Sequence, residues 1–298
     1  MDSPHTATFL DNNNVLIIGG DKVYMFNPAD NTFSDITGVS GSLPRIGHTA
    51  TLLDDDKVLI VGGYSPGSDP DIAIIMAAGI LDLGSVPRTF GDITNLATMI
   101  YPRWGHTANL LTGEKVLILG CVETVLGSGS CFEAAVYDSS VGAFDWLYYS
   151  PGNLYRENHA SSMLVDGTVL ITGGWLYTLP GVSFIAQQQI YNPGTNSFIG
   201  TGSMVGVGTR ADHTSTRLND GSVLVVGGVN ALDLLATAEI YSAGSFVSTG
   251  SMAIERRYHT ATLLQGGKVL ITGGQSWYGA LGYAEIYDPA LGGFSANN

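Results

Sequence analysis

Histidine and arginine are the residues of this 298-residue chain whose types and spacing could do chemistry. An imidazole can bind a metal or move a proton, and a guanidinium can bind an anion. Each of the six histidines lies 14 residues before a glycine, and an arginine precedes five of them by three residues. Because every copy occupies one repeat position, we predict structural roles for His5, His48, His106, His159, His213, His259, Arg45, Arg103, Arg156, Arg210 and Arg256.

Reactive roles for the same residues compete with this prediction. A ring of six histidines could bind a metal, but we favour Nδ1 hydrogen bonds to the backbone, since buried polar side chains normally find backbone partners. The arginines could form an anion site, but Glu239 and Glu285 are available for pairing between strands. The GxSxG motif of serine hydrolases is absent. We therefore predict no catalytic residue and no metal ligand here.

The elements that position these residues repeat with them. Successive histidines are 43, 58, 53, 54 and 46 residues apart, a period typical of propeller blades or solenoids. Each unit has an HTATLL-like stretch, an apolar run ending at glycine, a segment like AEIYDP and a lone aromatic. This pattern predicts four short strands per unit. We expect an all-β fold, a six-bladed β-propeller of four-stranded antiparallel blades, because each unit buries its apolar face only against neighbours.

The predicted propeller occupies the whole chain, 1–298, as a single domain, since all-β rings commonly exceed about 200 residues. The expected blades cover approximately 1–37, 45–95, 103–149, 156–202, 210–250 and 256–298.

The repeat resembles a known family. The segments that carry the likeness are MAIERRYHTATLLQGGKVLITGG and AEIYDPALGGF, and the likeness extends over residues 5 to 294. They resemble the Kelch repeat, and more narrowly the bacterial galactose oxidase-like Kelch repeat proteins. That resemblance implies a Kelch-type propeller. It does not carry over the copper site of galactose oxidase-like enzymes, because every histidine here belongs to the repeat.

Composition limits the function classes. The chain has 12 Lys and Arg against 26 Asp and Glu, for a net charge of −14, which excludes a phosphate-neutralising surface and therefore nucleic acid as a partner. No apolar run is long enough to cross a membrane, and no signal peptide begins the chain. We expect a protein that does not span a membrane.

Two cysteines bracket one loop. Cys121 and Cys131 lie at the ends of VETVLGSGS, where antiparallel strands can bring Cβ atoms to disulfide distance. The alternative is two free, buried thiols. We expect the disulfide, which would indicate an oxidising compartment and hence an extracellular or surface-associated protein.

A short acidic loop could hold calcium. Residues 65–71 read SPGSDPD, and Asp69 and Asp71 offer oxygen ligands. The alternative is a solvated loop without a cation. We favour the solvated loop and therefore expect no cofactor.

Aromatic residues gather in one set of loops. In an up-and-down blade, the loop after the second strand and the loop between blades lie at the same end. Rigid Trp and Tyr side chains there could bind a ligand, or they could pack the gaps between blades, and both interpretations stay open. The candidate ligand-binding residues are Tyr64, Tyr101, Trp104, Tyr155, Trp175, Tyr177, Trp277 and Tyr278.

We interpret the chain as a non-catalytic recognition or scaffold propeller that binds a glycan or a protein through this aromatic loop face. The alternative is a sugar-handling enzyme, oxidase-like or epimerase-like, whose mouth would show converging Arg, Glu or Asp side chains with a perturbed pKa. A third class is a structural subunit of a surface layer, phage particle or filament, which would self-assemble through flat apolar patches.

Overall fold

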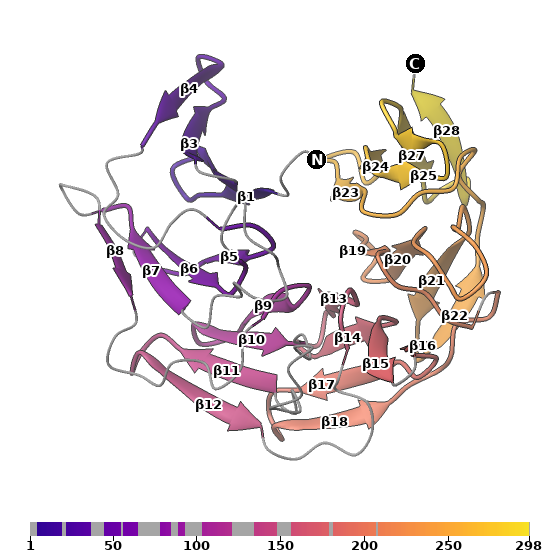
Figure 1. Ribbon diagram of the computed structural model, residues 1–298, viewed down its shortest axis with the longest axis horizontal. Coiled ribbons are helices and arrows are strands. Elements are labelled where there is room, and N and C mark those ends of the chain that lie inside the picture. Colours follow the sequence, from indigo (N-terminus) through magenta and orange to yellow (C-terminus); the bar gives the residue numbers. More distant parts are fainter. Residues whose placement is uncertain are drawn as a thin grey trace. The chain divides into compact units, whose positions relative to one another are not determined.

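The computed structural model describes residues 5–19, 22–36, 45–54, 56–64, 78–84, 89–92, 103–120, 134–147, 156–178, 181–206 and 208–297. These residues form strands and turns, and no helix occurs among them. The chain divides into two compact units, Met1–Tyr149 and Ser150–Asn298. Each unit contains three four-stranded sheets (Figure 1), which are called blades 1 to 6 in chain order.

The first unit holds blades 1 to 3, each with four consecutive antiparallel strands. Blade 1 consists of β1 (His5–Phe9), β2 (Val15–Gly19), β3 (Lys22–Asn27) and β4 (Thr32–Asp35). Blade 2 consists of β5 (Thr49–Leu52), β6 (Lys57–Val61), β7 (Ala78–Asp82) and β8 (Thr89–Asp92). Blade 3 consists of β9 (Thr107–Leu111), β10 (Lys115–Leu119), β11 (Ala134–Asp138) and β12 (Ala143–Leu147).

The second unit holds blades 4 to 6 in the same order. Blade 4 consists of β13 (Ala160–Met163), β14 (Val169–Thr172), β17 (Gln189–Asn192) and β18 (Ser197–Gly200). Blade 5 consists of β19 (Thr214–Arg217), β20 (Val223–Val226), β21 (Ala238–Ser242) and β22 (Ser245–Ser248). Blade 6 consists of β23 (Thr260–Leu263), β24 (Val269–Thr272), β27 (Ala284–Asp288) and β28 (Gly293–Asn297).

Two hairpins extend the second unit beyond these sheets. β15 (Trp175–Thr178) pairs with β16 (Gly181–Phe184), and β25 (Gln275–Ser276) pairs with β26 (Gly279–Ala280). Both lie between the second and third strands of a blade, where the sequence predicted only loops. The all-β, six-bladed propeller of four-stranded antiparallel blades is confirmed, whereas the single domain over 1–298 stays a prediction.

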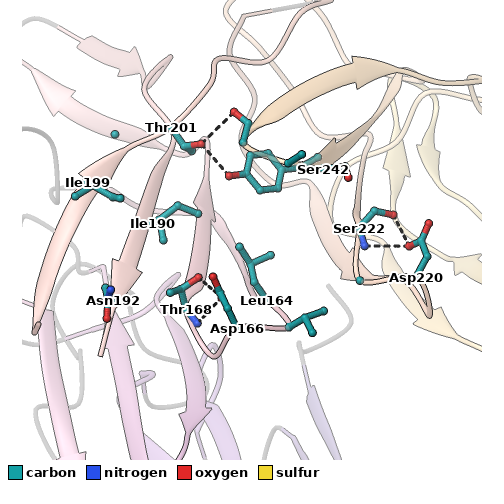
Figure 2. Close-up of a pocket in the computed structure, with 16 residues that line it drawn as sticks. Leu164, Asp166, Thr168, Ile190, Asn192, Ile199, Thr201, Asp220, Ser222 and Ser242 are labelled. Carbon is teal, nitrogen blue, oxygen red and sulfur yellow. Dashed lines mark hydrogen bonds between the residues drawn. The ribbon is translucent and has the colours of Figure 1, made fainter. Parts of the chain in front are cut away.

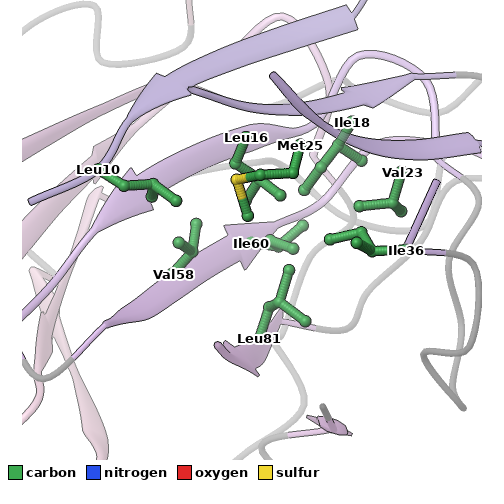
Figure 3. Packing of buried hydrophobic residues seen from close by; sticks show 9 residues of the cluster. All are labelled: Leu10, Leu16, Ile18, Val23, Met25, Ile36, Val58, Ile60 and Leu81. Atoms are coloured by element: carbon green, nitrogen blue, oxygen red, sulfur yellow. The ribbon is translucent and has the colours of Figure 1, made fainter. Parts of the chain in front are cut away.

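The second strand of each blade is the centre of the core. In β6, Val58 and Ile60 pack toward β2 of blade 1, against Leu16 and Ile18 (Figure 3). Leu59, between them, belongs to the cluster shared with blade 3. Alternate side chains of a strand point to opposite faces, so one strand serves two neighbouring blades. This explains why the run VLIV, residues 58–61, is apolar at every position rather than at every second one.

The repeat arginines are fully buried and join the blades. In each of the five, Nη1 donates to the carbonyl oxygen of the first glycine after the second strand of its own blade, at 2.7 to 3.3 Å. In three of them, Arg103, Arg210 and Arg256, the arginine carbonyl in turn accepts the N–H of the second glycine in the preceding blade. The N···O distances are 2.7 Å for Gly63 and Arg103, 2.8 Å for Gly174 and Arg210, and 2.8 Å for Gly228 and Arg256.

A carboxylate or an amide on the third strand completes the arginine site in the second unit. Nη2 of Arg210 lies 3.2 Å from Glu239, and Nη2 of Arg256 lies 2.7 Å from Glu285. In blade 4 the amide of Gln189 takes this position, 2.8 Å from Arg156. Fixed, buried partners of this kind suit the planar guanidinium fork.

The histidines form a second link between blades. In three blades, Nε2 of the histidine bonds to the threonine that directly follows the histidine of the preceding blade. The pairs are His48 with Thr6, His106 with Thr49 and His259 with Thr214, at 2.8 to 2.9 Å. Blade 4 has Ala160 at the threonine position, and Thr172, its register partner on β14, bonds to His213 instead at 2.8 Å.

The tautomer of His48 follows from its contacts. Its Nδ1 lies 3.2 Å from the carbonyl of Arg45, which can only accept, so Nδ1 carries the proton and the hydroxyl of Thr6 donates to Nε2. At His48 the predicted Nδ1 contact to the backbone is accompanied by a threonine bond that the sequence analysis missed, whereas Nδ1 of His213 has no hydrogen-bond partner.

We expect the histidines to make stability depend on pH. Burial lowers the pKa of His48 to about 4 and those of His106 and His259 to about 3. An unfolded histidine titrates near 6.5, so the unfolded chain binds more protons than the folded chain below that pH. The free energy of unfolding should fall by up to about 1.4 kcal/mol per pH unit for each histidine as the pH drops from 6.5 to about 4.

Urea unfolding of His259→Gln across this range should show a shallower pH slope than the parent protein. His5→Gln is the matched control, since His5 is exposed at the start of β1. Equal slopes in the parent and His259→Gln would contradict this account.

Candidate functional site

Several predicted site residues lie outside the described part of the chain. These are Tyr101, Tyr155, Cys121, Cys131, Asp69 and Asp71. The disulfide and the calcium site therefore stay predictions. Tyr177 lies on β15, in register with Val182.

Two of the predicted aromatic residues contact each other in the first unit. Tyr64 and Trp104 are half-buried, and their ring centroids lie 6.3 Å apart in an edge-on arrangement. Tyr64 is held by a backbone bridge to Ile46, beside the start of blade 2. Trp104 has its indole N–H buried. This pair packs between blades 2 and 3, and its role in ligand binding stays a prediction.

Trp175 of the second unit is likewise half-buried. Its ring stands edge-on to Phe184, its register partner across the β15–β16 hairpin, with centroids 5.6 Å apart. Aromatic pairs favour this geometry. The indole therefore stabilises the hairpin.

Trp277 and Tyr278 are different, because they lie at the exposed tip of the β25–β26 hairpin. Trp277 is 65% exposed and Tyr278 is 97% exposed. The indole Nε1 donates to Oδ1 of Asp233 in blade 5, at 3.1 Å. Leu232, next to Asp233, is 90% exposed. We call Leu232, Asp233, Trp277 and Tyr278 the loop surface of blades 5 and 6.

Local hydrogen bonds fix both loops that carry this surface. Oδ1 of Asn230 accepts the N–H groups of Leu232 and Asp233, at 2.9 and 2.8 Å, as Asx turns do. In blade 6, Gln275 and Arg257 exchange two backbone bonds, at 2.9 and 3.1 Å. The exposed side chains therefore stand on an ordered backbone, which lowers the entropy cost of binding.

A row of left-handed residues lies directly before the repeat histidines. In the first unit this position is glycine, at Gly47 and Gly105, but in the second unit it is Asn158, Asp212 and Tyr258, with φ of 53°, 55° and 57°. Asp212 donates its N–H to the carbonyl of Asn158, and Tyr258 donates to that of Asp212, at 2.9 and 3.1 Å. Residues other than glycine rarely adopt this backbone conformation, and those that do cluster at functional sites.

Asp212 is the chemically unusual member of this row. Its side chain has no exposed surface, and burial raises the pKa of its carboxyl group to about 7, although the Arg257 guanidinium 3.9 Å away opposes this shift. Arg257 also lies over the ring of Tyr258, 4.9 Å from its centroid. Burial and the nearby Asp212 raise the pKa of Tyr258 to about 12. Asp212 can therefore exchange a proton near neutral pH.

The sequence analysis missed Asp212, Arg257 and Tyr258. The signal was the third residue of the Arg-x-x-His motif, which changes from glycine in the first unit to asparagine, aspartate and tyrosine in the second. A residue that replaces glycine at a left-handed position is a candidate for function.

The structure defines the class of the protein as a six-bladed β-propeller. Among solved structures, one described as "Structure of YjhT" is similar to this chain, with a TM-score of 0.75. The match covers 100% of this chain and 97% of that one at 14% sequence identity, and it shows the fold alone. No protein-family model matches the sequence, and no curated protein sequence matches it.

The residues that the structure describes contain no helix of the length and hydropathy needed to cross a bilayer. The same part of the chain contains no group of three or more His, Cys, Asp or Glu side chains arranged to hold a metal ion.

We expect Asp212→Asn to stabilise the protein at high pH. The folded pKa of about 7 lies above the unfolded value of about 3.8, so the parent protein loses stability as the pH rises through this window. Asparagine has a similar shape and no charge. The variant should gain about 1 to 4 kcal/mol at pH 8 and nothing near pH 4. Thermal melts at both pH values measure the difference, and a loss of stability at pH 8 would show that Asp212 is stabilised as an anion.

Proposed function

We propose that this chain is a Kelch-type propeller that acts as a recognition module and binds a protein partner through the loop surface of blades 5 and 6. The observation that carries the proposal is the exposed indole of Trp277, held in place by Asp233. Rigid aromatic side chains are the commonest anchors of protein interfaces.

A protein fits this surface better than a glycan. Leu232 and Tyr278 are almost fully exposed on either side of the contact between Trp277 and Asp233. Grouped exposed apolar side chains mark protein interaction sites, whereas an exposed leucine gives a sugar hydroxyl nothing to bond. Asp233 supplies a polar group beside the indole. Glycan binding is the competing outcome of the experiment below.

The place of action is part of the same proposal. A disulfide between Cys121 and Cys131 would suit an extracellular or surface-associated protein. A Ca²⁺ ion at Asp69 and Asp71 would suit the same environment.

A second function, an acid–base enzyme acting on sugars, is supported by Asp212. A buried carboxyl that titrates near neutral pH, beside a phenol and a guanidinium, is the combination expected of a general acid or base. Asp212→Asn, which keeps the shape of the side chain, is the inactive control for any substrate screen. Recognition remains the first proposal, because the Asp212 side chain has no exposed surface.

Site-specific photo-crosslinking tests the recognition proposal. A photoreactive phenylalanine at Tyr278, in the cells that make the protein, should give a discrete protein adduct. The same residue at Leu291, which is 83% exposed in the β27–β28 turn, is the matched control and should give none. Trp277→Ala should abolish the adduct without lowering the melting temperature. Protein recognition would be overturned in favour of glycan binding by two results together. No adduct would form at Tyr278, and the protein would bind to a glycan array in a way that depends on Tyr278.

A further inference from the structure

A groove runs between blades 4 and 5 in the second unit (Figure 2), and its volume is about 620 Å³. It is built by the β13–β14, β19–β20 and β21–β22 turns together with β17 and β18. The turn that joins the first strand to the second and the turn that joins the third strand to the fourth lie at the same end of a blade. The loop surface of blades 5 and 6 follows a second strand and so lies at the other end. The groove is therefore a separate surface.

Two contacts between the blades bound the groove. On one side, the hydroxyls of Thr201 and Tyr241 are 2.8 Å apart, and the N–H of Gly202 donates to the carbonyl of Gly244 at 3.3 Å. On the other side, Val165 packs against Gly221, where an added Cβ would lie 2.5 Å from the valine Cγ2. The groove lies between these points, above the hydrophobic cluster that joins the two blades. A volume near 620 Å³ lies within the usual range for ligand pockets, about 300 to 1,000 Å³.

The lining of the groove combines aliphatic and polar side chains. Leu164, Ile190 and the ring of Tyr241 contribute to its walls. Val165 and Ile199 also line it, although they are 76% and 59% exposed. Exposed branched aliphatic side chains around a concave surface indicate a site for an apolar group.

Each of the two facing turns adds a carboxylate. Oδ1 of Asp166 accepts from the N–H and hydroxyl of Thr168, and Oδ1 of Asp220 accepts in the same way from Ser222. Figure 2 shows both carboxylates with these bonds. The bonds lower the pKa of both groups, which are therefore ionised at neutral pH. No lysine or arginine lines the groove.

One cation stands beside this lining. Arg217 donates from Nη1 to the carbonyl of Leu164 at 3.4 Å. It offsets one of the two carboxylates, so the local charge is still negative. The whole chain carries −14, which steers cationic partners toward it at low ionic strength.

We propose that the groove between blades 4 and 5 binds a peptide segment of a partner protein in which an aliphatic residue lies between basic residues. The aliphatic side chain packs on Leu164, Ile190 and Ile199. The flanking cations pair with Asp166 and Asp220. This site is independent of the loop surface and of the function proposed for it.

Calorimetric titration with short peptides tests the proposal. The probe is an acetylated, amidated pentapeptide of alternating lysine and leucine. Matched peptides replace lysine with glutamate or leucine with serine. The lysine–leucine peptide should bind at low salt, and both matched peptides should bind at least about tenfold more weakly, since each lacks one of the two interactions.

Variants locate the binding. Asp166→Asn combined with Asp220→Asn keeps the acceptor of each turn and removes both charges, so affinity should fall about fivefold or more. Asp30→Asn is the matched control, because Asp30 makes the same turn with Thr32 in blade 1. Ser242→Trp should fill the groove and abolish binding, whereas Trp277→Ala should leave it intact. The proposal is overturned if the lysine–leucine peptide does not bind, or if the double asparagine and Ser242→Trp variants bind it as the parent does.

Discussion

The contact of one buried arginine with two glycines determines how the blades of each unit join. The guanidinium bonds to the first glycine of its own blade, and the arginine carbonyl bonds to the second glycine of the preceding blade. The same carbonyl and the next histidine ring approach the first glycine closely. At Gly227, an added Cβ would lie 2.7 Å from the carbonyl oxygen of Arg256 and 2.8 Å from the ring of His259. Glycine is required because the next blade occupies the space of a side chain.

This contact also explains where function can lie. In blades 2 to 6 the residue directly before the histidine has a left-handed backbone, and hydroxyl bonds hold His213 and His259 in place. The residue directly before the histidine can therefore vary in its side chain but not in its backbone conformation. The second unit uses this freedom for Asp212 and Tyr258. The loops after the second strand vary further, and there Trp277 is supported by hydrogen bonds rather than by a core.

The repeat made much of this structure predictable, because a spacing that recurs six times identifies blades and their inner strands directly. Arg210 and Glu239 could be matched from sequence for the same reason. The aromatic residues could not be sorted in this way, since Trp175 and Trp277 follow equivalent strands but differ in exposure. Phe184 lies across the hairpin from Trp175, and no ring lies across from Trp277 in its shorter hairpin. Asp212 and the groove were missed because both depend on distances between separate blades.

The most direct test of the central contact is the free energy of unfolding of Gly227→Ala measured against Gly167→Ala. Both glycines have positive φ, of 65° and 80°, but nothing lies within 4 Å of an added Cβ at Gly167. Left-handed strain alone should cost Gly167→Ala about 1 to 2 kcal/mol. Gly227→Ala should lose at least about 3 kcal/mol, because its methyl group also displaces Arg256 and His259 of the next blade. Equal losses in the two variants would show that the blades do not depend on this contact.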